Sequence, residues 1–310
     1  MDNLTKNLAQ HLNSLRKRQN LTILQLVDGI GSHRQYLRYL SGESVLPYDK
    51  LKLFCERLSM TLDAFFFSLR SLEDKEYPII SKLHELTANS EFESVVKFCK
   101  KHELTELNNP QNKKFYEYAY FRAQYKTDRL NLYSVLEKFQ DLIDYPNCLN
   151  KTIFDYVDIS VLSSITEIEI KQGRSDALEK LNEILLNKDL LFSSNELKHI
   201  LPAVYANVAL FLGRLKRYEE SLIIADKGLA FSKLHNDMSS LGHLLYLKAY
   251  NSLVTDKEHD ALISAARCLA FCMATDNKHQ IEIFYKTLKK DFGFDIFEVF
   301  FKYKAELLYL

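Results

Sequence analysis

One short segment concentrates side chains that can form hydrogen bonds with the edges of nucleic-acid bases. Arg34 and Arg38 can each donate to guanine, and Gln35 can both donate to and accept from adenine. If this segment is a helix that lies in a major groove, its polar face can also contact phosphates. The residues on it that we predict to contact DNA are Ser32, His33, Arg34, Gln35, Arg38 and Tyr39.

Two short amphipathic helices joined by a tight turn would position these side chains. Apolar residues recur at helical spacing through 24–30, and Thr22 stands where a helix N-cap belongs. Gly31 then interrupts the pattern, as the turn of a helix-turn-helix often does. A second pattern starts with Ser32 or His33 as its cap. The residues predicted for the apolar face of this second helix are Tyr36, Leu37 and Leu40.

Residues 8–66 resemble the helix-turn-helix domain of the XRE family, the lambdoid phage repressor type. The matching framework residues are Leu12, Leu15, Arg16, Leu21, Thr22, Leu26, Gly31, Leu37, Leu40, Pro47, Leu51, Leu58 and Phe65. The resemblance implies a DNA-binding domain of five helices over residues 1–70, with the second helix of the motif as the recognition helix. Lys17 and Arg18, outside that helix, are expected to contact phosphates.

Two positions depart from the family's pattern. The family has Gln after the capping Thr, where this chain has Ile23. It also has Glu at the end of the recognition helix, paired with the arginine that matches Arg16, where this chain has Ser41. We expect Glu43 to substitute as the partner of that arginine. The alternative interpretation is any small helical domain with a basic face.

Composition favours two helical parts of different charge. The chain has 310 residues, 47% of them hydrophobic, and only eight glycines and five prolines. Its net charge is zero, yet residues 1–70 hold ten Lys and Arg against six Asp and Glu, while the remainder holds 31 against 35. A basic first part and an acidic second part are what a nucleic-acid-binding module joined to an effector module would show.

The sequence predicts no metal site and no membrane contact. Five cysteines are scattered, and Cys268 with Cys272 has no further ligand nearby, so we expect buried thiols. The first residues lack the apolar segment of a signal peptide, and no stretch approaches 18 apolar residues. We therefore expect a cytoplasmic protein.

No pattern predicts an enzyme. The sequence contains no GxGxxG, GxxxxGK[ST], HExxH or GxSxG motif. Its nine histidines are scattered, and an isolated histidine on a helix is more often a surface or core residue than a ligand. We therefore predict neither catalytic residues nor a cofactor.

From residue 79 onward the sequence is helical nearly throughout, and it repeats. The segment 203–231 resembles a tetratricopeptide repeat (TPR), in which small residues let neighbouring helices approach closely. The small residues that mark successive units are Ser94, Ser134, Ala177, Ser221 and Ala261, at spacings of 40, 43, 44 and 40 residues. The resulting prediction is a TPR-like solenoid of about five units over residues 79–290, after a linker at 71–78. A capping helix is expected over 291–310.

The concave face of such a solenoid usually binds an extended peptide, and polar residues on the first helix of a unit would hold it. In TPR proteins an Asn at the position of Asn207 often clamps peptide amides, because its side chain both donates and accepts. Arg214 could meet a carboxylate; the opposing interpretation of Asn207 is a polar contact between helices. The predicted peptide-binding residues are Asn207, Arg214, Tyr205, Phe211, Tyr246, Tyr250, Asn251, Tyr118 and Arg122.

The combination of an XRE-type helix-turn-helix, a short linker and degenerate helical repeats resembles the peptide-pheromone-responsive regulators of the Rgg/PlcR/PrgX type (RRNPP). The resemblance implies a homodimeric transcription regulator that acts in quorum sensing. Its repeats would bind a short signalling peptide, and its first domain double-stranded DNA. The alternatives are a phage or mobile-element repressor that answers to a protein partner, and a TPR scaffold that does not bind DNA.

Overall fold

The computed structural model describes residues 3–73, 76–186, 197–275 and 278–293, with 295, 297, 298 and 301. The chain divides into two compact units, the first made of 1–91 with 100–108 and the second of 92–99 with 109–310. Within the described residues the regular structure is helical and no strand occurs, which confirms the all-α prediction. None of the helices described combines the length and the hydrophobicity that crossing a bilayer requires.

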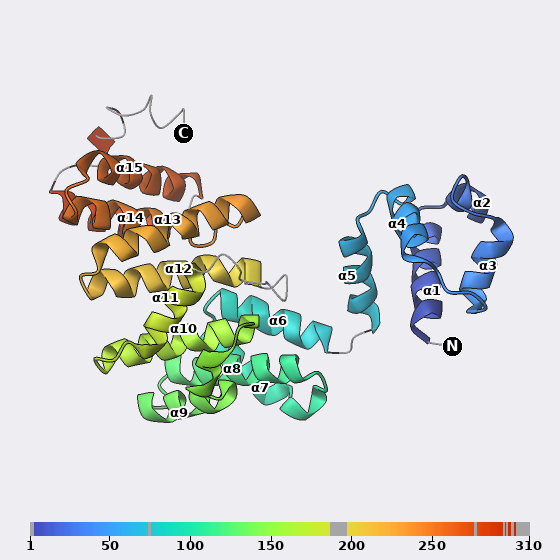
Figure 1. Cartoon of the computed structure of the whole chain (residues 1–310), viewed down its shortest axis with the longest axis horizontal. Helices are drawn as coiled ribbons and strands as arrows, with labels where there is room; N and C mark the ends of the chain where they lie inside the picture. The colour runs from blue at the N-terminus through green and yellow to red at the C-terminus, as the bar shows by residue number, and fades with distance from the viewer. Residues whose placement is uncertain are drawn as a thin grey trace. The chain divides into compact units, whose positions relative to one another are not determined.

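The first unit begins with the five helices that the sequence predicts (Figure 1). Its elements are α1 (Asn3–Arg18), α2 (Ile23–Val27), α3 (His33–Ser41), α4 (Tyr48–Arg57), α5 (Leu62–Glu73), α6 (Tyr77–Ala88) and the short 3-10 helix η1 (Leu104–Glu106). Helix α5 extends through Glu73 and α6 starts at Tyr77, so helical residues occupy much of the predicted linker 71–78.

Helices α1 to α5 enclose a core of large apolar side chains. Leu12 from α1 and Leu26 from α2 are fully buried with the aromatic rings of Tyr36, Phe54 and Phe65. The rings of Tyr36 and Phe54 meet edge to face, with 5.7 Å between their centroids. This core packs against one side of α3, and side chains on the opposite side are exposed.

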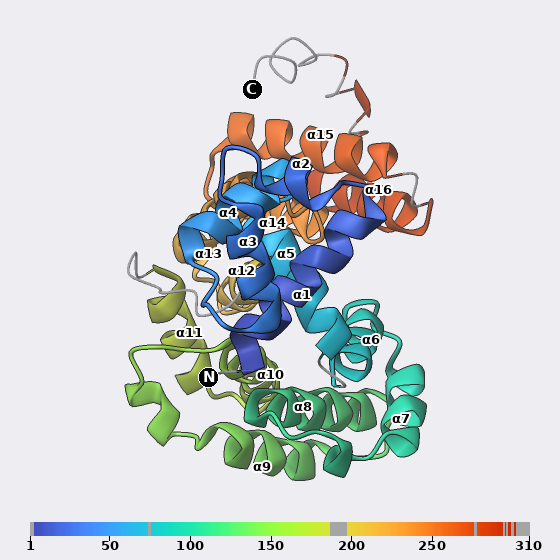
Figure 2. The ribbon, with the colours of Figure 1, turned by 90° about the vertical axis from the view of Figure 1, so that its right-hand side faces the viewer.

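The second unit is a series of helical hairpins (Figures 1 and 2). Its elements are α7 (Phe92–Lys101, through Cys99), α8 (Pro110–Lys126), α9 (Leu132–Ile143), the 3-10 helix η2 (Asn147–Asn150), α10 (Tyr156–Lys171), α11 (Asp176–Leu186), α12 (Leu197–Arg214), α13 (Tyr218–His235), α14 (Leu241–Val254), α15 (Glu258–Ala274) and α16 (Lys278–Phe292).

These hairpins form two layers. Helices α8, α10, α12, α14 and α16 pack side by side, each against the next, and we call them the A layer. Helices α9, α11, α13 and α15 follow them in the chain and pack against them, and we call these the B layer. The side of the A layer that faces away from the B layer is called its open face. This alternation is that of a TPR-like array and agrees with the predicted fold.

The small residues that mark the predicted repeats lie near the start of α7 and of each B-layer helix. Ala177, Ser221 and Ala261 are fully buried there. At the two earlier units the fully buried residue is a valine one position later, Val95 or Val135. The sequence pattern therefore locates the helices correctly and misplaces two of the contact residues by one position.

Gly228 is where the absence of a side chain matters most for the packing of the second unit. A Cβ atom at this position would lie 2.7 Å from the Cβ atom of Tyr205 and 2.8 Å from a methyl carbon of Leu244. Those residues belong to α12 and α14, so glycine lets α13 approach both A-layer helices.

The last helix that the structure describes is α16, which ends at the buried Phe292. Most of the predicted capping helix over 291–310, including Phe294 and Phe300, lies outside the described residues. Tyr285 donates a hydrogen bond to Asp295 at 2.9 Å, and its ring lies 5.5 Å from that of Phe297. The capping helix itself stays a prediction.

Candidate DNA-binding helix and candidate effector surface

Both ends of α3 are capped by hydrogen bonds within the segment. The side-chain oxygen of Ser32 accepts a hydrogen bond from the backbone N–H of Gln35 at 3.1 Å. At the other end Gly42 adopts a left-handed φ of 82°, and its N–H donates to the carbonyl of Tyr39. Neither cap uses an arginine side chain, so both arginines of this helix remain available to a ligand.

Four side chains share the side of α3 that faces solvent. An α-helix turns by 100° per residue, which places these four side chains within one arc of about 100° around the helix axis. They are Arg34, Leu37, Arg38 and Ser41, and all four are exposed. His33 is exposed at one edge of this arc, and Gln35 is half-buried at the other.

The predicted positions of Tyr39 and Leu37 on α3 are wrong. Tyr39 is 6% exposed and belongs to the core of the first unit, whereas Leu37 is 44% exposed. Tyr36, at 1% exposed, sets the core side of the helix. A residue three positions later lies 60° from it and one position later lies 100° from it. Tyr39 therefore cannot face DNA across this helix, and Leu37 takes its place on the outer side.

The motif's first helix is anchored by backbone contacts. Thr22 and Gln25 form a capping box. The backbone N–H of Gln25 donates to Oγ1 of Thr22 at 3.2 Å, and the backbone N–H of Thr22 donates to Oε1 of Gln25 at 2.8 Å. The guanidinium of Arg57 on α4 donates to the carbonyls of Gln25 and Asp28, at 2.7 and 2.8 Å. These bonds fix the end of α2 and the start of the turn.

The turn between α2 and α3 uses a different glycine from the one that the sequence suggests. Gly29 has a φ of 68°, in the left-handed region, whereas Gly31 is not at a positive φ. Lys50 reaches the turn from α4 and donates to the carbonyl of Ile30. The positive φ at Gly29 provides the reversal of chain direction.

Arg16 is satisfied without the family's glutamate. Its Nε donates to the side-chain oxygen of Asn13 at 2.9 Å, and its terminal nitrogen donates to the carbonyl of Leu21. Glu43 instead lies 3.8 Å from Nε of Arg38. The expectation that Glu43 replaces the missing partner is therefore wrong, because a backbone carbonyl takes that role.

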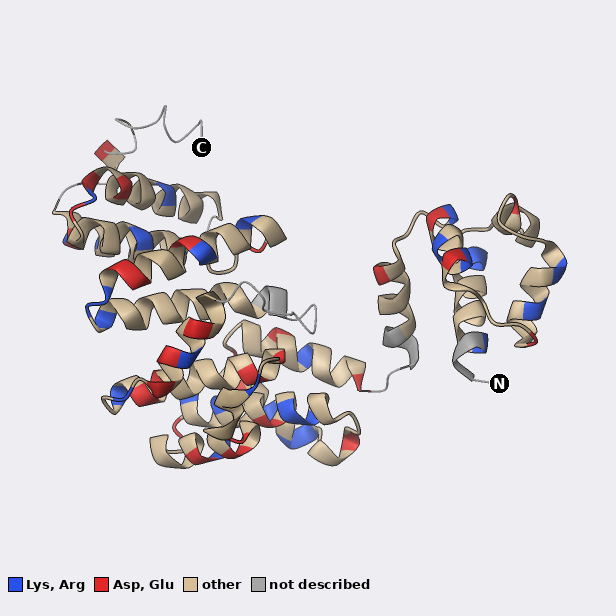
Figure 3. Ribbon diagram, in the orientation of Figure 1, with Lys and Arg blue, Asp and Glu red and all other residues tan. Residues whose placement is uncertain are grey.

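The first unit presents other cations to solvent besides those of α3. Lys17 and Arg18 are exposed in the last turn of α1, and Lys52 is exposed on α4. Figure 3 shows lysines and arginines on these three helices. Lys17 and Arg18 thus have the exposure that a phosphate contact requires.

A stripe of side chains on α12 forms part of the open face of the A layer. It consists of Ala203, Asn207, Leu210 and Arg214, at spacings of four, three and four residues, with the core-facing residues on the opposite side. Nδ2 of Asn207 donates to Oγ of Ser163 on α10 at 3.3 Å. The guanidinium of Arg214 lies 5.9 Å from the centre of the Phe211 ring. Asn207 and Arg214 are the predicted residues that the structure leaves accessible on α12.

Tyr205, Phe211 and Asn251 are core residues, so their prediction as ligand contacts is wrong. Tyr205 and Phe211 are buried in the hairpin of α12 and α13. Asn251 is fully buried, and its Nδ2 donates to Oγ of Ser221 at 2.8 Å and to the carbonyl of Leu247 at 2.7 Å. Its amide links α14 to α13 and is closed to a ligand.

Tyr246 and Tyr250 on α14 are half-buried and lie next to each other. Their ring centroids are 6.4 Å apart, and the ring planes are inclined by 28° in an offset stack. The hydroxyl of Tyr246 donates to a carboxylate oxygen of Asp291 on α16 at 2.9 Å. Burial, and then this bond, raise the pKa of Tyr246, so its hydroxyl stays protonated and acts as a donor.

Tyr118 and Arg122 are committed to packing around α7 and α8. Tyr118 is buried, and Arg122 donates to its hydroxyl at 2.9 Å. The same guanidinium lies 5.8 Å from the centre of the Phe92 ring and 5.9 Å from that of Tyr118. The prediction of Tyr118 as a peptide contact is wrong, and Arg122 is half-buried between two rings.

An ion cluster between α8 and α10 escaped the sequence analysis. Glu167 accepts hydrogen bonds from Lys126 at 2.8 Å and Lys171 at 3.1 Å, and Lys171 also donates to the hydroxyl of Tyr125 at 3.2 Å. Burial alone would raise the pKa of Glu167, but the two ammonium groups outweigh it, and the pKa lies below its ordinary value. The cluster carries one positive charge in excess.

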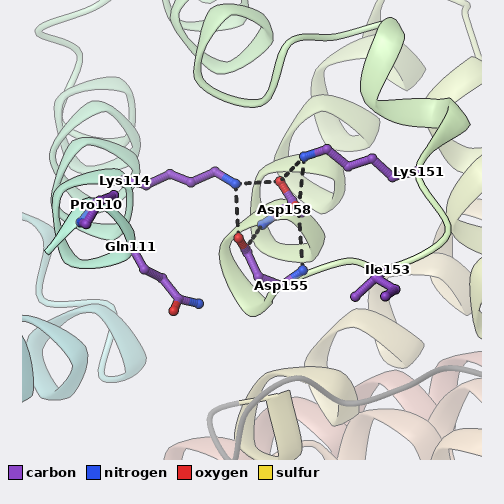
Figure 4. A pocket seen from close by; sticks show the side chains of 7 residues that line it. All are labelled: Pro110, Gln111, Lys114, Lys151, Ile153, Asp155 and Asp158. Carbon is purple, nitrogen blue, oxygen red and sulfur yellow. Dashed lines mark hydrogen bonds and ion pairs between the residues drawn. The ribbon is translucent and has the colours of Figure 1, made fainter.

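A cavity of about 500 Å³ lies at the opposite ends of the same two helices (Figure 4). Lys114 on α8 donates to Asp155 at 3.2 Å and to Asp158 at 2.5 Å, and Lys151 bonds both oxygens of Asp158 at 3.3 Å. Asp155 also caps α10, because its side-chain oxygen accepts hydrogen bonds from two backbone N–H groups in the first turn of that helix. Lys114 and Asp158 are 44 residues apart, which is one repeat length. This separation was the signal in the sequence that the two residues lie at corresponding places on neighbouring A-layer helices.

Solved structures with this fold cover nearly the whole chain. The first is Bacillus thuringiensis PlcR in complex with the peptide PapR7 and DNA, with 18% identity, 91% of this chain and 99% of that chain covered, and a TM-score of 0.67. Streptococcus dysgalactiae SHP pheromone receptor Rgg2 has 13% identity, 91% and 99% coverage, and a TM-score of 0.59. The PrgX/cCF10 complex has 15% identity, 93% and 99% coverage, and a TM-score of 0.59.

At these identities the structural likeness shows a shared fold. No curated protein sequence matches the chain significantly. The family model of the RNPP family C-terminal domain, however, matches residues 80–263, which is more than half of the chain. The matched stretch covers the helices from α6 to the beginning of α15. This chain belongs to the RNPP family.

Proposed function

We propose that the chain is a DNA-binding transcription regulator controlled by a short signalling peptide, which binds on the open face of the A layer. The observation that carries the proposal is the combination, in one chain, of a capped arginine-bearing helix in a repressor-type unit with RNPP-type repeats. The PlcR structure contains both a peptide and DNA, and PrgX was solved with cCF10, which supports carrying both ligand classes over to this chain.

The DNA contacts would come from the outer side of α3. Arg34 and Arg38 would donate to base edges in the major groove, with Gln35 and His33 at the margins of the contact. Ser32, Lys17 and Arg18 would donate to phosphates and hold the orientation of the helix. Tyr39 has no part in this contact, because it is buried.

The peptide contacts would come from the A layer around α12. Asn207 would exchange its 3.3 Å bond with Ser163 for bonds to a peptide amide, and Arg214 would meet a carboxylate or a carbonyl. The half-buried rings of Tyr246 and Tyr250 on the next A-layer helix would contact apolar peptide side chains. The peptide expected to bind is therefore mainly apolar.

A homodimer is part of the proposal. One repressor-type unit covers one half-site, and specific affinity generally requires two. Half-sites would then lie roughly 10 or 20 base pairs apart, one or two turns of the DNA helix. Light scattering at micromolar protein checks this, and a monomer both with and without DNA would contradict it.

Two binding measurements on the full chain test the proposal. The first is a gel shift with genomic DNA fragments over a range of salt concentrations, in which specific binding should weaken steeply as salt rises. The second is calorimetry with synthetic peptides encoded by short reading frames near the gene. Failure of all DNA fragments would leave a TPR-like scaffold, and failure of all peptides would point to a protein effector.

A further inference from the structure

The outer side of α3 contains an apolar side chain, Leu37, next to Arg34. Leu37 lies one position before Arg38 and three after Arg34, which places it about 60° around the helix from Arg34. It is 44% exposed, on the side of α3 that also presents Arg34 and Arg38 to solvent. The core of the unit is closed on the other side of the helix by Tyr36 and Tyr39.

The placement of Leu37 follows from the helix and not from a loose local structure. Both caps of α3 are formed, so the helix is regular at its two ends. A rotation of about 100° that buried Leu37 would expose a tyrosine of the core side. Because Leu37 lies next to Arg34 on the outer side of α3, a ligand that contacts Arg34 can also cover Leu37. In a major groove the apolar group available to a leucine is the C5-methyl group of thymine.

Resting on the proposed DNA-binding function, we propose that Leu37 is a specificity-determining residue that selects thymine through its C5-methyl group. Arg34 and Arg38 select guanines through N7 and O6, and the leucine selects a thymine beside them. Covering the leucine and the methyl group together removes apolar surface of both from water. The preferred half-site therefore combines guanine with a thymine whose methyl group faces α3.

Uracil provides a direct test, because it differs from thymine only by the missing methyl group. The full chain is first used to select duplexes from a random-sequence DNA library, which yields its preferred half-site. Each thymine of that half-site is then replaced by deoxyuridine, one at a time, and affinity is measured by fluorescence anisotropy at fixed salt. At one position the wild type should lose about fourfold in affinity, which corresponds to ~0.8 kcal/mol for one buried methyl group.

Leu37→Ala should bind the thymine and deoxyuridine duplexes equally at that position. Leu53→Ala is the matched control, because Leu53 lies on α4, is 40% exposed, and undergoes the same truncation. It should retain the fourfold difference. A selected half-site at which Leu37→Ala responds to deoxyuridine as the wild type does would overturn the inference about the leucine while leaving DNA binding intact. Selection of no sequence at all would instead refute the DNA-binding function.

Discussion

The outer side of α3 and the open face of α12 both carry polar groups in a helical stripe, but they prepare them for ligands differently. On α3 the arginines project to solvent, and the only ion pair that involves them is an exposed contact of 3.8 Å to Glu43 within the described residues. On α12, Asn207 is already bonded to Ser163 and Arg214 already lies over Phe211. Under the proposed function, DNA docks on exposed side chains, whereas the peptide has to replace the bond between Asn207 of α12 and Ser163 of α10. The second kind of surface is the one that can transmit binding to its neighbours.

The largest expected effect is on DNA binding. Arg34→Ala and Arg38→Ala should each weaken binding to the preferred site by ~1–3 kcal/mol and relax its sequence preference. Lys52→Ala, which removes an exposed cation of α4, should change affinity much less and leave the preference unchanged. Anisotropy titrations at one salt concentration measure all three. Unchanged preference in both arginine variants would mean that α3 is not the reading helix.

Two asparagines separate the open face from the core of the second unit. Asn207→Ala should weaken peptide binding by ~1–3 kcal/mol, roughly 5- to 150-fold, and leave the unfolding free energy nearly unchanged. Asn251→Ala should lower the free energy of unfolding by ~1–3 kcal/mol, because it removes buried hydrogen bonds to Ser221 and Leu247. Calorimetry with peptide and denaturant titrations give the two readouts. An Asn207→Ala protein with wild-type peptide affinity would place the effector elsewhere.

Close packing in the second unit gives a prediction for Gly228. Gly228→Ala should lower the free energy of unfolding by ~1–3 kcal/mol, because its Cβ would approach Tyr205 and Leu244 within 2.8 Å. Gly31→Ala is the control, since nothing lies within 4 Å of a Cβ there and its φ is not positive. Thermal unfolding of both variants checks the difference. Equal melting temperatures would show that α13 can move away from α12 and α14 at little cost.

The smallest effect is expected at the ion cluster of α8 and α10. Because the lysines lower the pKa of Glu167 in the folded state, its ionised form stabilises the fold above the ordinary carboxyl pKa. That contribution is lost as the pH falls through the lowered value. Glu167→Gln should therefore cost less than ~1 kcal/mol at pH 7, and the difference from wild type should vanish in acid. Denaturant titrations at several pH values measure it, with Glu183→Gln as the control for an exposed carboxylate. A difference that persists at low pH would contradict the assignment.

The sequence predicts the elements better than the side of each element that is exposed. Helical spacing and caps locate α2 and α3, and small residues locate the B-layer helices. The sequence pattern assigns Leu37 to the core side of α3 and Tyr39 to the exposed side, the reverse of the structure. A tyrosine and a leucine can each occupy a core or a polar surface, and the pattern of a nine-residue helix does not decide between them. Burial of Tyr36 determines which side of α3 faces the core, and Tyr39 lies on that side.

The second unit shows why equal spacing does not imply equal position. Asn207 and Asn251 are 44 residues apart, but the fully buried markers that follow them, Ser221 and Ala261, are 40 apart. Asn251 therefore lies about one helical turn nearer the B-layer helix and is buried. The clusters around Glu167 and Asp158 were missed because they join residues of two A-layer helices.

The most direct test of the account is the coupling between its two surfaces. DNA affinity of the full chain should be measured by anisotropy on the selected site, first alone and then with a saturating amount of a peptide that calorimetry has shown to bind. We expect the peptide to change the dissociation constant for DNA by roughly 5- to 150-fold, a coupling of ~1–3 kcal/mol, and we expect Asn207→Ala to reduce the effect at subsaturating peptide. An identical dissociation constant for DNA with and without bound peptide would contradict it.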